Sequence, residues 1–287
     1  MQFEPEVTIL ADSISPKGIR LTTFQLKYWR AVHSEMMTHR VFSRCAQSSR
    51  ATPIEKTFEN IKNGAWGPAK WTKNCKGMVA QEELDAKHIP YANLTWDLAA
   101  QNMITIAQGF VNMGIHKQIV NRLLEPFNSI NVVVSSTCWN NFWKLRQAHD
   151  ADPSIKILAD KMHEVFDQHE PEKLDYGQWH LPYIQEEDWN LVKEYQKNTD
   201  SPKNLSTLMY LCRVSAARCA RVSYKAFDGT TSIEQDLNLF NRLAQDGHMT
   251  PLEHVAMADD GKFPEEYGNF IGWRQLRKMM PNEFIPG

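Results

Sequence analysis

The segment from Met36 to Pro53, MMTHRVFSRCAQSSRATP, concentrates side chains that bind anions. It holds one histidine, three arginines and several hydroxyl groups: His39, Arg40, Arg44, Arg50, Ser43, Ser48 and Ser49. An arginine fork binds a phosphate through two parallel hydrogen bonds, and serine hydroxyls can complete the shell around it. Composition alone fits a phosphate pocket and a solvated loop with scattered arginines equally well.

The order of these residues is more specific than their composition. The run THRVFSRCAQSSR resembles the signature R-H-R-x-x-S-x-N-E-x-S-x-R of the flavin-dependent thymidylate synthases. The matching residues are His39, Arg40, Ser43, Ser48 and Arg50. Three positions differ, because Thr38, Cys45 and Ala46 stand where the signature has Arg, Asn and Glu.

Two segments near the C-terminal end resemble the same family. GHMTPLEH, from Gly247 to His254, is similar to the family's G-H-x-S/T-P-x-E-H, whose His, Thr and Glu line the flavin site. The segment ARVSY, from Ala220 to Tyr224, precedes it as in the family. The resemblance implies that the flavin contacts four residues here: His248, Thr250, Glu253 and, near its phosphates, Ser223.

The middle of the chain carries a third resemblance. NRLLEPF, followed by VVVSSTCWNNFWKLR, is similar to the family's A-R-x-x-L-P, a strand, and N-F-L-x-L-R. This implies a nucleotide-binding role for Arg122, a flavin contact for Asn141 and a base-binding role for Arg146. In cellular members the RVSY and GH…EH pieces come first, whereas here they come last, so the chain looks most like longer, phage-encoded versions with a permuted motif order.

The resemblance implies a reaction and its cofactors. The family transfers a one-carbon unit from methylenetetrahydrofolate to C5 of dUMP, and reduced FAD, with NADPH as reductant, supplies the hydride that completes the methyl group of dTMP. The protein would supply placement and electrostatics. Arg146 would stabilise negative charge on the uracil ring, and Ser48 would contact the nucleotide near its base. Both are the implied catalytic residues.

The remaining roles follow from the same resemblance. Arg50 and Arg122 would hold the nucleotide phosphate. Besides the C-terminal residues, the flavin would contact His39, Arg40, Ser43, Cys45 and Asn141. A homotetramer with active sites shared between subunits is also implied.

Three substitutions in the signature keep other activities open. Phages make modified pyrimidines, so a hydroxymethylase or methyltransferase acting on dUMP or dCMP is one alternative, although a charged Arg146 suits a carbonyl edge better than the amino group of cytosine. A nucleotide-binding homologue without catalysis is another. Cys45 would have a lowered pKa as a thiolate beside Arg40 and Arg44, or it is a small neutral replacement for Asn.

The overall composition limits the possible partners. The chain has 287 residues, 42% of them hydrophobic, with 32 basic and 34 acidic side chains, which predicts a globular protein without a nucleic-acid or membrane surface. Its cysteines form no CxxC pair and no zinc spacing, so we expect no metal site and a reducing, cytoplasmic location, the host cytoplasm if the chain is phage-encoded. No secretion or membrane-spanning segment is apparent. The cysteines are Cys45, Cys75, Cys138, Cys212 and Cys219.

Periodicity predicts the elements that position these residues. Alternation in GIRLTTFQL, residues 18–26, predicts a strand, and a four-residue spacing of Phe24, Tyr28, Val32 and Met36 predicts a helix from Phe24 onward. Further helices are expected over 95–115, along the stripe from Ile155 to Val165, around Ser215–Ala220, and from a capping box at 231–234 to Gly247. INVVVSS, residues 130–136, reads as a buried strand.

These elements predict an α+β fold with a small, mainly antiparallel sheet and long packed helices. We expect one domain over 1–287 with irregular insertions near 60–95 and 168–203. The first, with Trp66 and Trp71, reads as a surface loop or a substrate lid, and the second as a linker or crossing loop. Other candidates have structural explanations: packed or capping His116 and His180, buried thiols at Cys138 and Cys212, and helix caps at Asp150 and Asp152.

Overall fold

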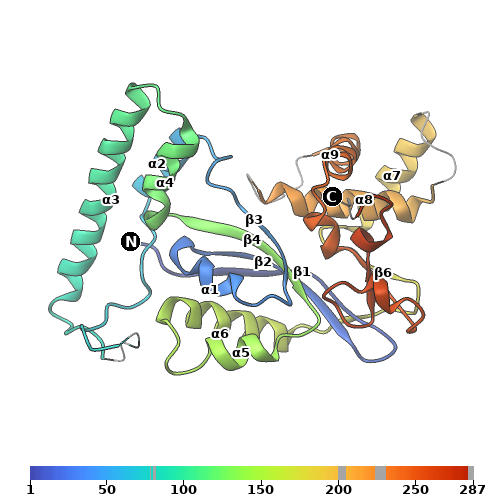
Figure 1. Ribbon diagram of the computed structural model, residues 1–287, viewed down its shortest axis with the longest axis horizontal. Coiled ribbons are helices and arrows are strands. Elements are labelled where there is room, and N and C mark those ends of the chain that lie inside the picture. The colour runs from blue at the N-terminus through green and yellow to red at the C-terminus, as the bar shows by residue number, and fades with distance from the viewer. Residues whose placement is uncertain (78, 80–81, 200–204, 224–230, 284–287) are drawn as a thin grey trace.

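A five-stranded sheet in the order β3-β4-β2-β1-β5 forms the centre of the computed structural model, which describes residues 1–77, 79, 82–199, 205–223 and 231–283 (Figure 1). All neighbours pair antiparallel except β1 and β5. The predicted α+β class with a mainly antiparallel sheet is confirmed. The strands are β1 (Glu6–Ile14), β2 (Arg20–Trp29), β3 (Ser43–Ala46), β4 (Ser129–Ser136) and β5 (Glu172–Lys173).

One face of this sheet is apolar and closed by two helices, α5 (Asn140–Arg146) and α6 (Pro153–Gln168). Alternate residues of β2 and β4, including Phe24, Leu26 and Val132, pack there together with residues of α6. Because successive strand residues point to opposite faces, the other face carries Gln25, Lys27 and Asn131. The predicted strand at 130–136 and helix at 155–165 are both confirmed.

The helix expected from Phe24 is wrong. Strand β2 continues to Trp29, and only the 3-10 helix η1 (Arg30–Val32) and the short helix α1 (His33–Met37) follow it. A four-residue spacing is an even number, so Phe24 and Tyr28 also share one face of a strand. Pairing with β1 and β4 along the whole of β2 decided between the two readings.

A helical layer covers one end of the sheet, at the left of Figure 1. It contains α2 (Ile54–Lys62), α3 (Ile89–Asn112) and α4 (Lys117–Leu124), which share an apolar core. The helix predicted over 95–115 therefore begins earlier, at Ile89. Between α2 and α3 the described chain is irregular, but Trp66 is buried and its carbonyl accepts a hydrogen bond from Trp96 at 2.8 Å, so the surface-loop reading is wrong at Trp66.

Three helices pack at the other end of the molecule, α7 (Glu186–Asn198), α8 (Thr207–Arg221) and α9 (Ile233–Gln245). Helix α7 lies inside the predicted crossing loop of 168–203, where acidic residues masked its apolar spacing. The helix predicted around Ser215–Ala220 is confirmed as part of α8, and its small residues are buried. The capping box of α9 joins Ser232 to Gln235, one residue later than predicted.

The predictions for helix caps and buried cysteines are confirmed in part. His116 caps α4 by accepting from the Gln118 amide, and Asp152 caps α6. Cys212 is buried, but Cys138 is exposed, so that thiol prediction is wrong. No described helix has the length and apolar character needed to span a bilayer.

The guanidinium of Arg218 links helices α7, α8 and α9. From α8 it donates to both carboxylate oxygens of Asp188 at 2.7 Å and to Asp236 on α9 at 2.9 Å. All three side chains are buried, and Asp236 also accepts from Arg221 at 2.7 Å. A buried charge needs such complete pairing, because removing one partner leaves the other desolvated and unpaired.

Replacing Asp236 with alanine should lower the free energy of unfolding by about 3–5 kcal/mol, since Arg218 loses one of its two carboxylates in a dry environment. Urea unfolding followed by circular dichroism measures this change. Asp160→Ala, which removes the exposed ion pair with Lys156 at 3.2 Å, is the matched control and should cost at most about 0.5 kcal/mol. Equal losses in the two variants would contradict the role given to Asp236.

A row of buried polar side chains joins the main sheet to a second sheet, made of β6 (Trp179–His180), β7 (Ala256–Ala258) and β8 (Trp273–Gln275). His180 contacts the Ser13 hydroxyl at 2.9 Å and the Thr23 hydroxyl at 2.8 Å. Thr23 contacts Ser135 at 2.6 Å, and Ser135 contacts His254 at 2.8 Å. Burial lowers the pKa of His180 and of His254 to about 3, so both imidazoles are neutral at neutral pH.

These lowered histidine pKa values make stability depend on pH. Unfolded histidine takes up its proton near pH 6.5, whereas His180 in the folded chain does so near 3; stability is therefore complete above about pH 6.5 and falls as acid is added. His180→Gln keeps hydrogen-bonding groups but cannot titrate. The difference in free energy of unfolding between parent and variant should shrink between about pH 7 and pH 5. Parallel pH profiles would contradict this explanation.

Candidate functional site

Residues from the Met36–Pro53 segment and from the two C-terminal segments meet at the sheet edge formed by β3. The hydroxyl of Ser43 donates to Glu253 at 2.7 Å, which joins β3 to the 3-10 helix η3 (Thr250–His254). The amide of Ser48 donates to the carbonyl of Ser223 at 2.8 Å. The two ends of the chain thus meet although about 200 positions separate Ser43 from Glu253. Tyr224 of the ARVSY segment lies outside the described residues.

Two adjoining cavities form a groove at this meeting point. One encloses about 600 Å³ and the other about 500 Å³, and they share Arg44, Ala46 and Thr250 as common walls. Each cavity is lined by some of the residues predicted to contact the cofactor. Arg40 and Glu253 line the first cavity, whereas Cys45, Ser223 and His248 line the second. We call the two cavities together the β3 groove.

The first cavity of the β3 groove is positively charged. Its described lining contains the cations Arg40, Arg44, Arg277 and Lys278, and Glu253 is its one carboxylate. Arg277 pairs with Glu253, whereas the exposed Arg40 has no hydrogen bond or ion pair with any described residue. The second cavity adds an apolar wall of Ala220, Leu239, Leu243 and Pro251. A cationic opening beside an apolar wall suits a ring system that carries phosphate.

A polar network holds Glu253 in place. Besides Ser43 and Arg277, it involves Asn269, whose amide oxygen accepts from Gln275 at 2.8 Å and from Ser43 at 3.1 Å. The 3-10 helix η5 (Leu276–Met279) supplies Arg277 and Lys278. The sequence reading missed all four of the residues added here, Asn269, Gln275, Arg277 and Lys278. Gln275, Arg277 and Lys278 belong to the basic run WRQLRKMM, which matches no motif, and Asn269 lies before it.

His39, which follows α1, and Arg146 of α5 form a separate cluster and line neither cavity of the groove. Arg146 pairs with Glu35 at 2.7 Å, donates to the Thr38 hydroxyl at 2.8 Å and donates through Nε to Nε2 of His39 at 3.0 Å. Burial, followed by the charges of Arg146 and Arg44, lowers the pKa of His39 to about 4, so its ring accepts as a neutral base.

This cluster explains one departure from the family signature. Thr38, where the signature has an arginine, accepts a hydrogen bond from Arg146. An arginine at that position would bring a second guanidinium against Arg146 in place of an acceptor. The base-binding role of Arg146 and the flavin contact of His39 stay predictions, because within this chain the donors of Arg146 are directed at Glu35, Thr38 and His39.

Three further predicted residues are exposed and line none of the cavities described here: Arg50, Arg122 and Asn141. The buried side chain of Asn121 nevertheless connects the first two, because it donates from α4 to the carbonyls of Ser49 at 2.8 Å and Thr52 at 2.9 Å. It thereby holds the loop that carries Ser48 and Arg50 against the helix that carries Arg122. Their shared phosphate site stays a prediction.

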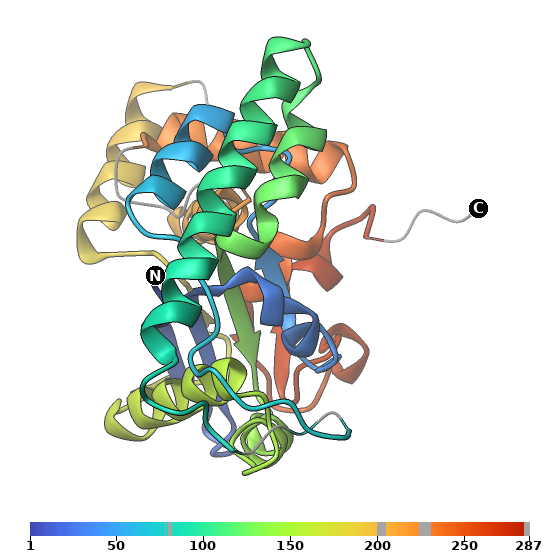
Figure 2. The same ribbon diagram turned by 90° about the vertical axis from the view of Figure 1, so that its left-hand side faces the viewer.

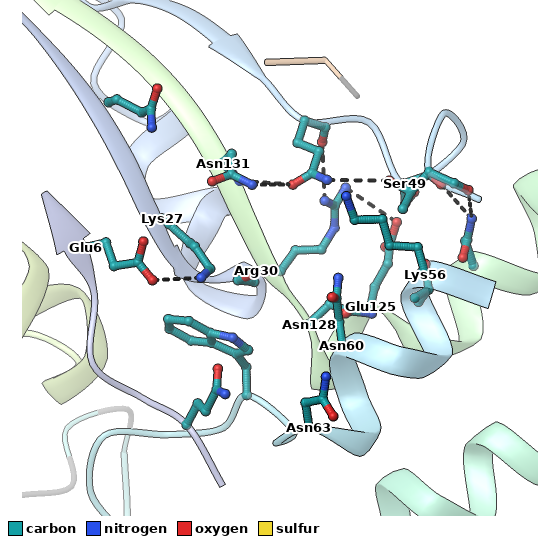
Figure 3. A pocket seen from close by; sticks show the side chains of 18 residues that line it. Glu6, Lys27, Arg30, Ser49, Lys56, Asn60, Asn63, Glu125, Asn128 and Asn131 are labelled. Atoms are coloured by element: carbon teal, nitrogen blue, oxygen red, sulfur yellow. Dashed lines mark hydrogen bonds and ion pairs between the residues drawn. The ribbon is translucent and has the colours of Figure 1, made fainter. Parts of the chain in front are cut away.

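A third cavity, of about 520 Å³, lies between the polar face of the sheet and α2 (Figure 3). Carboxamides dominate its lining, and its charged groups are mostly paired within the chain: Lys27 with Glu6 at 2.7 Å and Arg30 with Glu125 at 3.5 Å. Asn131 donates to Gln47 at 2.9 Å. Ser49 lines this cavity, so the cavity lies beside the loop that carries Ser48 and Arg50. No sequence motif pointed to it.

The thiolate reading of Cys45 is wrong. Neighbouring residues of β3 point to opposite faces, so Cys45 packs with Val133, Cys219 and Val222 while Arg44 projects the other way. Burial, with smaller contributions from Cys219 and Glu253, raises the pKa of Cys45 well above its usual range. Its side chain acts as a small neutral group in the wall of the groove.

Alkylation with iodoacetamide near pH 8 should therefore modify Cys75 and Cys138, which are exposed, and leave Cys45 unmodified in the folded protein. Peptide mass spectrometry gives the modified fraction at each site. Urea-unfolded protein is the control, in which Cys45 should react as fast as the others. Rapid modification of native Cys45 would restore the thiolate interpretation.

No protein-family model matches the sequence, and no curated protein matches it. Among solved structures, a UMP/dUMP methylase PolB from Streptomyces cacaoi bound with 5-Br UMP is similar over 58% of this chain and 90% of that chain, with 13% identity and a TM-score of 0.46. Its complex with 5-Br dUMP gives the same identity and TM-score, over 58% and 92%.

A flavin-dependent thymidylate synthase ThyX from Helicobacter pylori, complexed with FAD and dUMP, is similar over 53% of this chain and 68% of that chain, with 17% identity and a TM-score of 0.36. TM-scores and identities this low establish neither a shared fold nor a shared function.

Proposed function

We propose that this protein is a flavin-dependent enzyme that transfers a one-carbon unit from methylenetetrahydrofolate to C5 of dUMP and gives dTMP by reductive methylation. One observation carries the proposal: residues that resemble the family's flavin site come from two ends of the sequence and line one groove. The Ser43 hydroxyl donates a hydrogen bond to Glu253 at 2.7 Å. One cavity is lined by Cys45, Ser223, His248 and Thr250.

FAD suits the chemistry of the groove. Arg40, Arg44 and Lys278 would bind its phosphates, and the apolar wall formed by Leu239 and Pro251 would contact a ring. When bound, the flavin would supply the hydride, with NADPH as its reductant. Glu253, held by Ser43 and Arg277, would accept a hydrogen bond from a donor on the ligand. These groups bind and orient, and they exclude water from the apolar side.

The nucleotide would bind at the loop that Asn121 holds to α4. Arg50 and Arg122 are exposed cations, and they would share the phosphate, with Ser48 toward the base. The predicted stabilisation of uracil by Arg146 requires that its present acceptors, Glu35 among them, release it or that a second subunit rearranges the cluster. A homotetramer with shared sites, one domain per chain and a cytoplasmic location belong to the same proposal.

A second candidate is a hydroxymethylase or methyltransferase acting on dUMP or dCMP. It is favoured by Ala46, which forms a wall common to both cavities of the groove where the family signature has Glu. Loss of that carboxylate makes the centre of the groove less polar and changes which groups could orient a nucleophile. A product carrying a hydroxymethyl group would identify this activity.

The purified protein should retain added FAD and should convert dUMP to dTMP when methylenetetrahydrofolate and NADPH are supplied. Visible absorption of the desalted protein reports the flavin, and mass spectrometry reports the product. Parallel reactions with dCMP distinguish the second candidate. A protein that binds dUMP but no flavin and forms no product would be a nucleotide-binding homologue, which overturns the proposal.

Arg40→Ala should weaken FAD binding about tenfold or more, because a hydrogen bond to a charged group contributes about 1.5–3 kcal/mol. The loss should shrink at high salt. Lys87→Ala removes an exposed cation outside the groove and is the matched control, for which FAD affinity should stay unchanged.

A further inference from the structure

The cavity of about 520 Å³ between the sheet and α2, which we call the polar cavity, has walls unlike those of the β3 groove (Figure 3). Figure 1 and Figure 2 show α2 and α4 between α3 and the sheet, and both helices contribute to its lining. Among the 18 described side chains that line it, Trp66 is the single aromatic or aliphatic one and eight are carboxamides. Pockets for aromatic ligands are mostly apolar, so these walls suit a hydroxylated ligand.

One buried oxygen in the lining of the polar cavity has no partner. Asn121 is 2% exposed, and its amide nitrogen donates to the carbonyls of Ser49 at 2.8 Å and Thr52 at 2.9 Å. These two bonds fix the orientation of the amide, and its Oδ1 accepts no hydrogen bond from the described chain. A buried acceptor without a partner is unfavourable, because it has lost water and gained nothing in return. A donor on a bound molecule would satisfy it.

Two other asparagines of the lining are held in the same way. Asn128 donates through Nδ2 to the last carbonyl of α4 at 2.9 Å, and Asn131 donates through Nδ2 to Gln47 at 2.9 Å. The side-chain oxygens of both asparagines accept no bond from the described residues. Gln25 is the reverse, because its oxygen accepts from the Tyr183 hydroxyl and its amide nitrogen remains as a donor. A hydroxyl group both donates and accepts, so it can pair with either kind of group.

The charged groups of the polar cavity leave one cation over. Lys27 pairs with Glu6 at 2.7 Å, and Arg30 pairs with Glu125 at 3.5 Å. Lys56 of α2 also lines the cavity, but its exposed side chain has no hydrogen bond or ion pair with any described residue. An ammonium group binds phosphate as a point charge. The polar cavity therefore suits a molecule with several hydroxyl groups and one anionic group.

We propose that the polar cavity binds a phosphorylated sugar, whose hydroxyl groups pair with the asparagine oxygens and whose phosphate pairs with Lys56. The unpartnered Oδ1 of Asn121 would then accept from one sugar hydroxyl. Two sources carry this chemistry, a free sugar phosphate and the ribose phosphate of a nucleotide. Trp66 is 6% exposed and gives a base little surface for stacking, which favours the free sugar phosphate.

Isothermal titration calorimetry with glucose 6-phosphate, ribose 5-phosphate, UMP and inorganic phosphate tests the site. One of the two sugar phosphates should bind saturably and more tightly than inorganic phosphate, because its hydroxyl groups add hydrogen bonds. Lys56→Ala should weaken that binding about tenfold or more, since hydrogen bonds to charged groups are the strong ones. Lys62→Ala removes an exposed cation of the same helix that lies outside the cavity. It is the matched control, for which the affinity should stay unchanged.

Two further variants test the contacts to the sugar. Asn121→Ala removes the buried acceptor and should weaken binding of the sugar phosphate but not of inorganic phosphate. Asn60 is exposed in the lining, and its side chain has no partner in the described chain. Asn60→Trp should therefore fill the cavity and abolish binding while the circular dichroism spectrum stays that of the parent.

Four results would overturn the proposal: no binding of either sugar phosphate, binding no tighter than that of inorganic phosphate, binding of UMP alone, or binding that Asn60→Trp leaves unchanged. The titrations contain no flavin and no folate. Their failure would therefore leave the proposed one-carbon transfer standing, and failure of that reaction would leave the sugar phosphate site standing.

Discussion

The position of half of the candidate site depends on one buried guanidinium. Arg218 on α8 bridges Asp188 on α7 and Asp236 on α9, and all three side chains are buried. Because an unpaired buried charge is costly, this pairing favours the observed arrangement of the three helices. Helix α8 ends at Arg221, two residues before Ser223, and α9 ends just before His248. The paired charges therefore determine where both residues stand relative to β3.

The central sheet supplies the other half of the site because its two faces have different chemistry. The face with Phe24 and Val132 is closed by α5 and α6. The opposite face is apolar at one end, where Cys45 and Val133 meet α8, and polar at the other, where Lys27 and Asn131 line a cavity. Residues of strand β3 line the groove, and the loop that follows β3 lines the polar cavity through Gln47 and Ser49. A ligand in the groove and a ligand at the Ser48 loop would therefore be neighbours along the chain.

Local patterns predicted the elements wherever one period was unambiguous. The run Ile130–Ser136 and the stripe from Ile155 were read correctly, since β-branched residues and a 3.6-residue spacing each allow one structure. The chain after Phe24 was misread because a spacing of four fits a strand as well as a helix. Helix α7 was missed because polar and charged residues outnumber its four apolar ones. In both cases contacts with residues distant in the sequence determined the secondary structure, and a short stretch of sequence does not show those contacts.

The sequence by itself determined which chemical groups are available: the arginines and serines of 39–50, the GHMTPLEH segment and the carboxamides that line the polar cavity. Only the tertiary structure decided which of them meet. It brought Glu253 to Ser43 and added Arg277, whereas it turned Arg146 toward Glu35 and enclosed Cys45, whose pKa burial then raised. Contacts between distant residues and the loss of water around a side chain arise only when strands pair and helices pack, so the order of residues alone does not contain them.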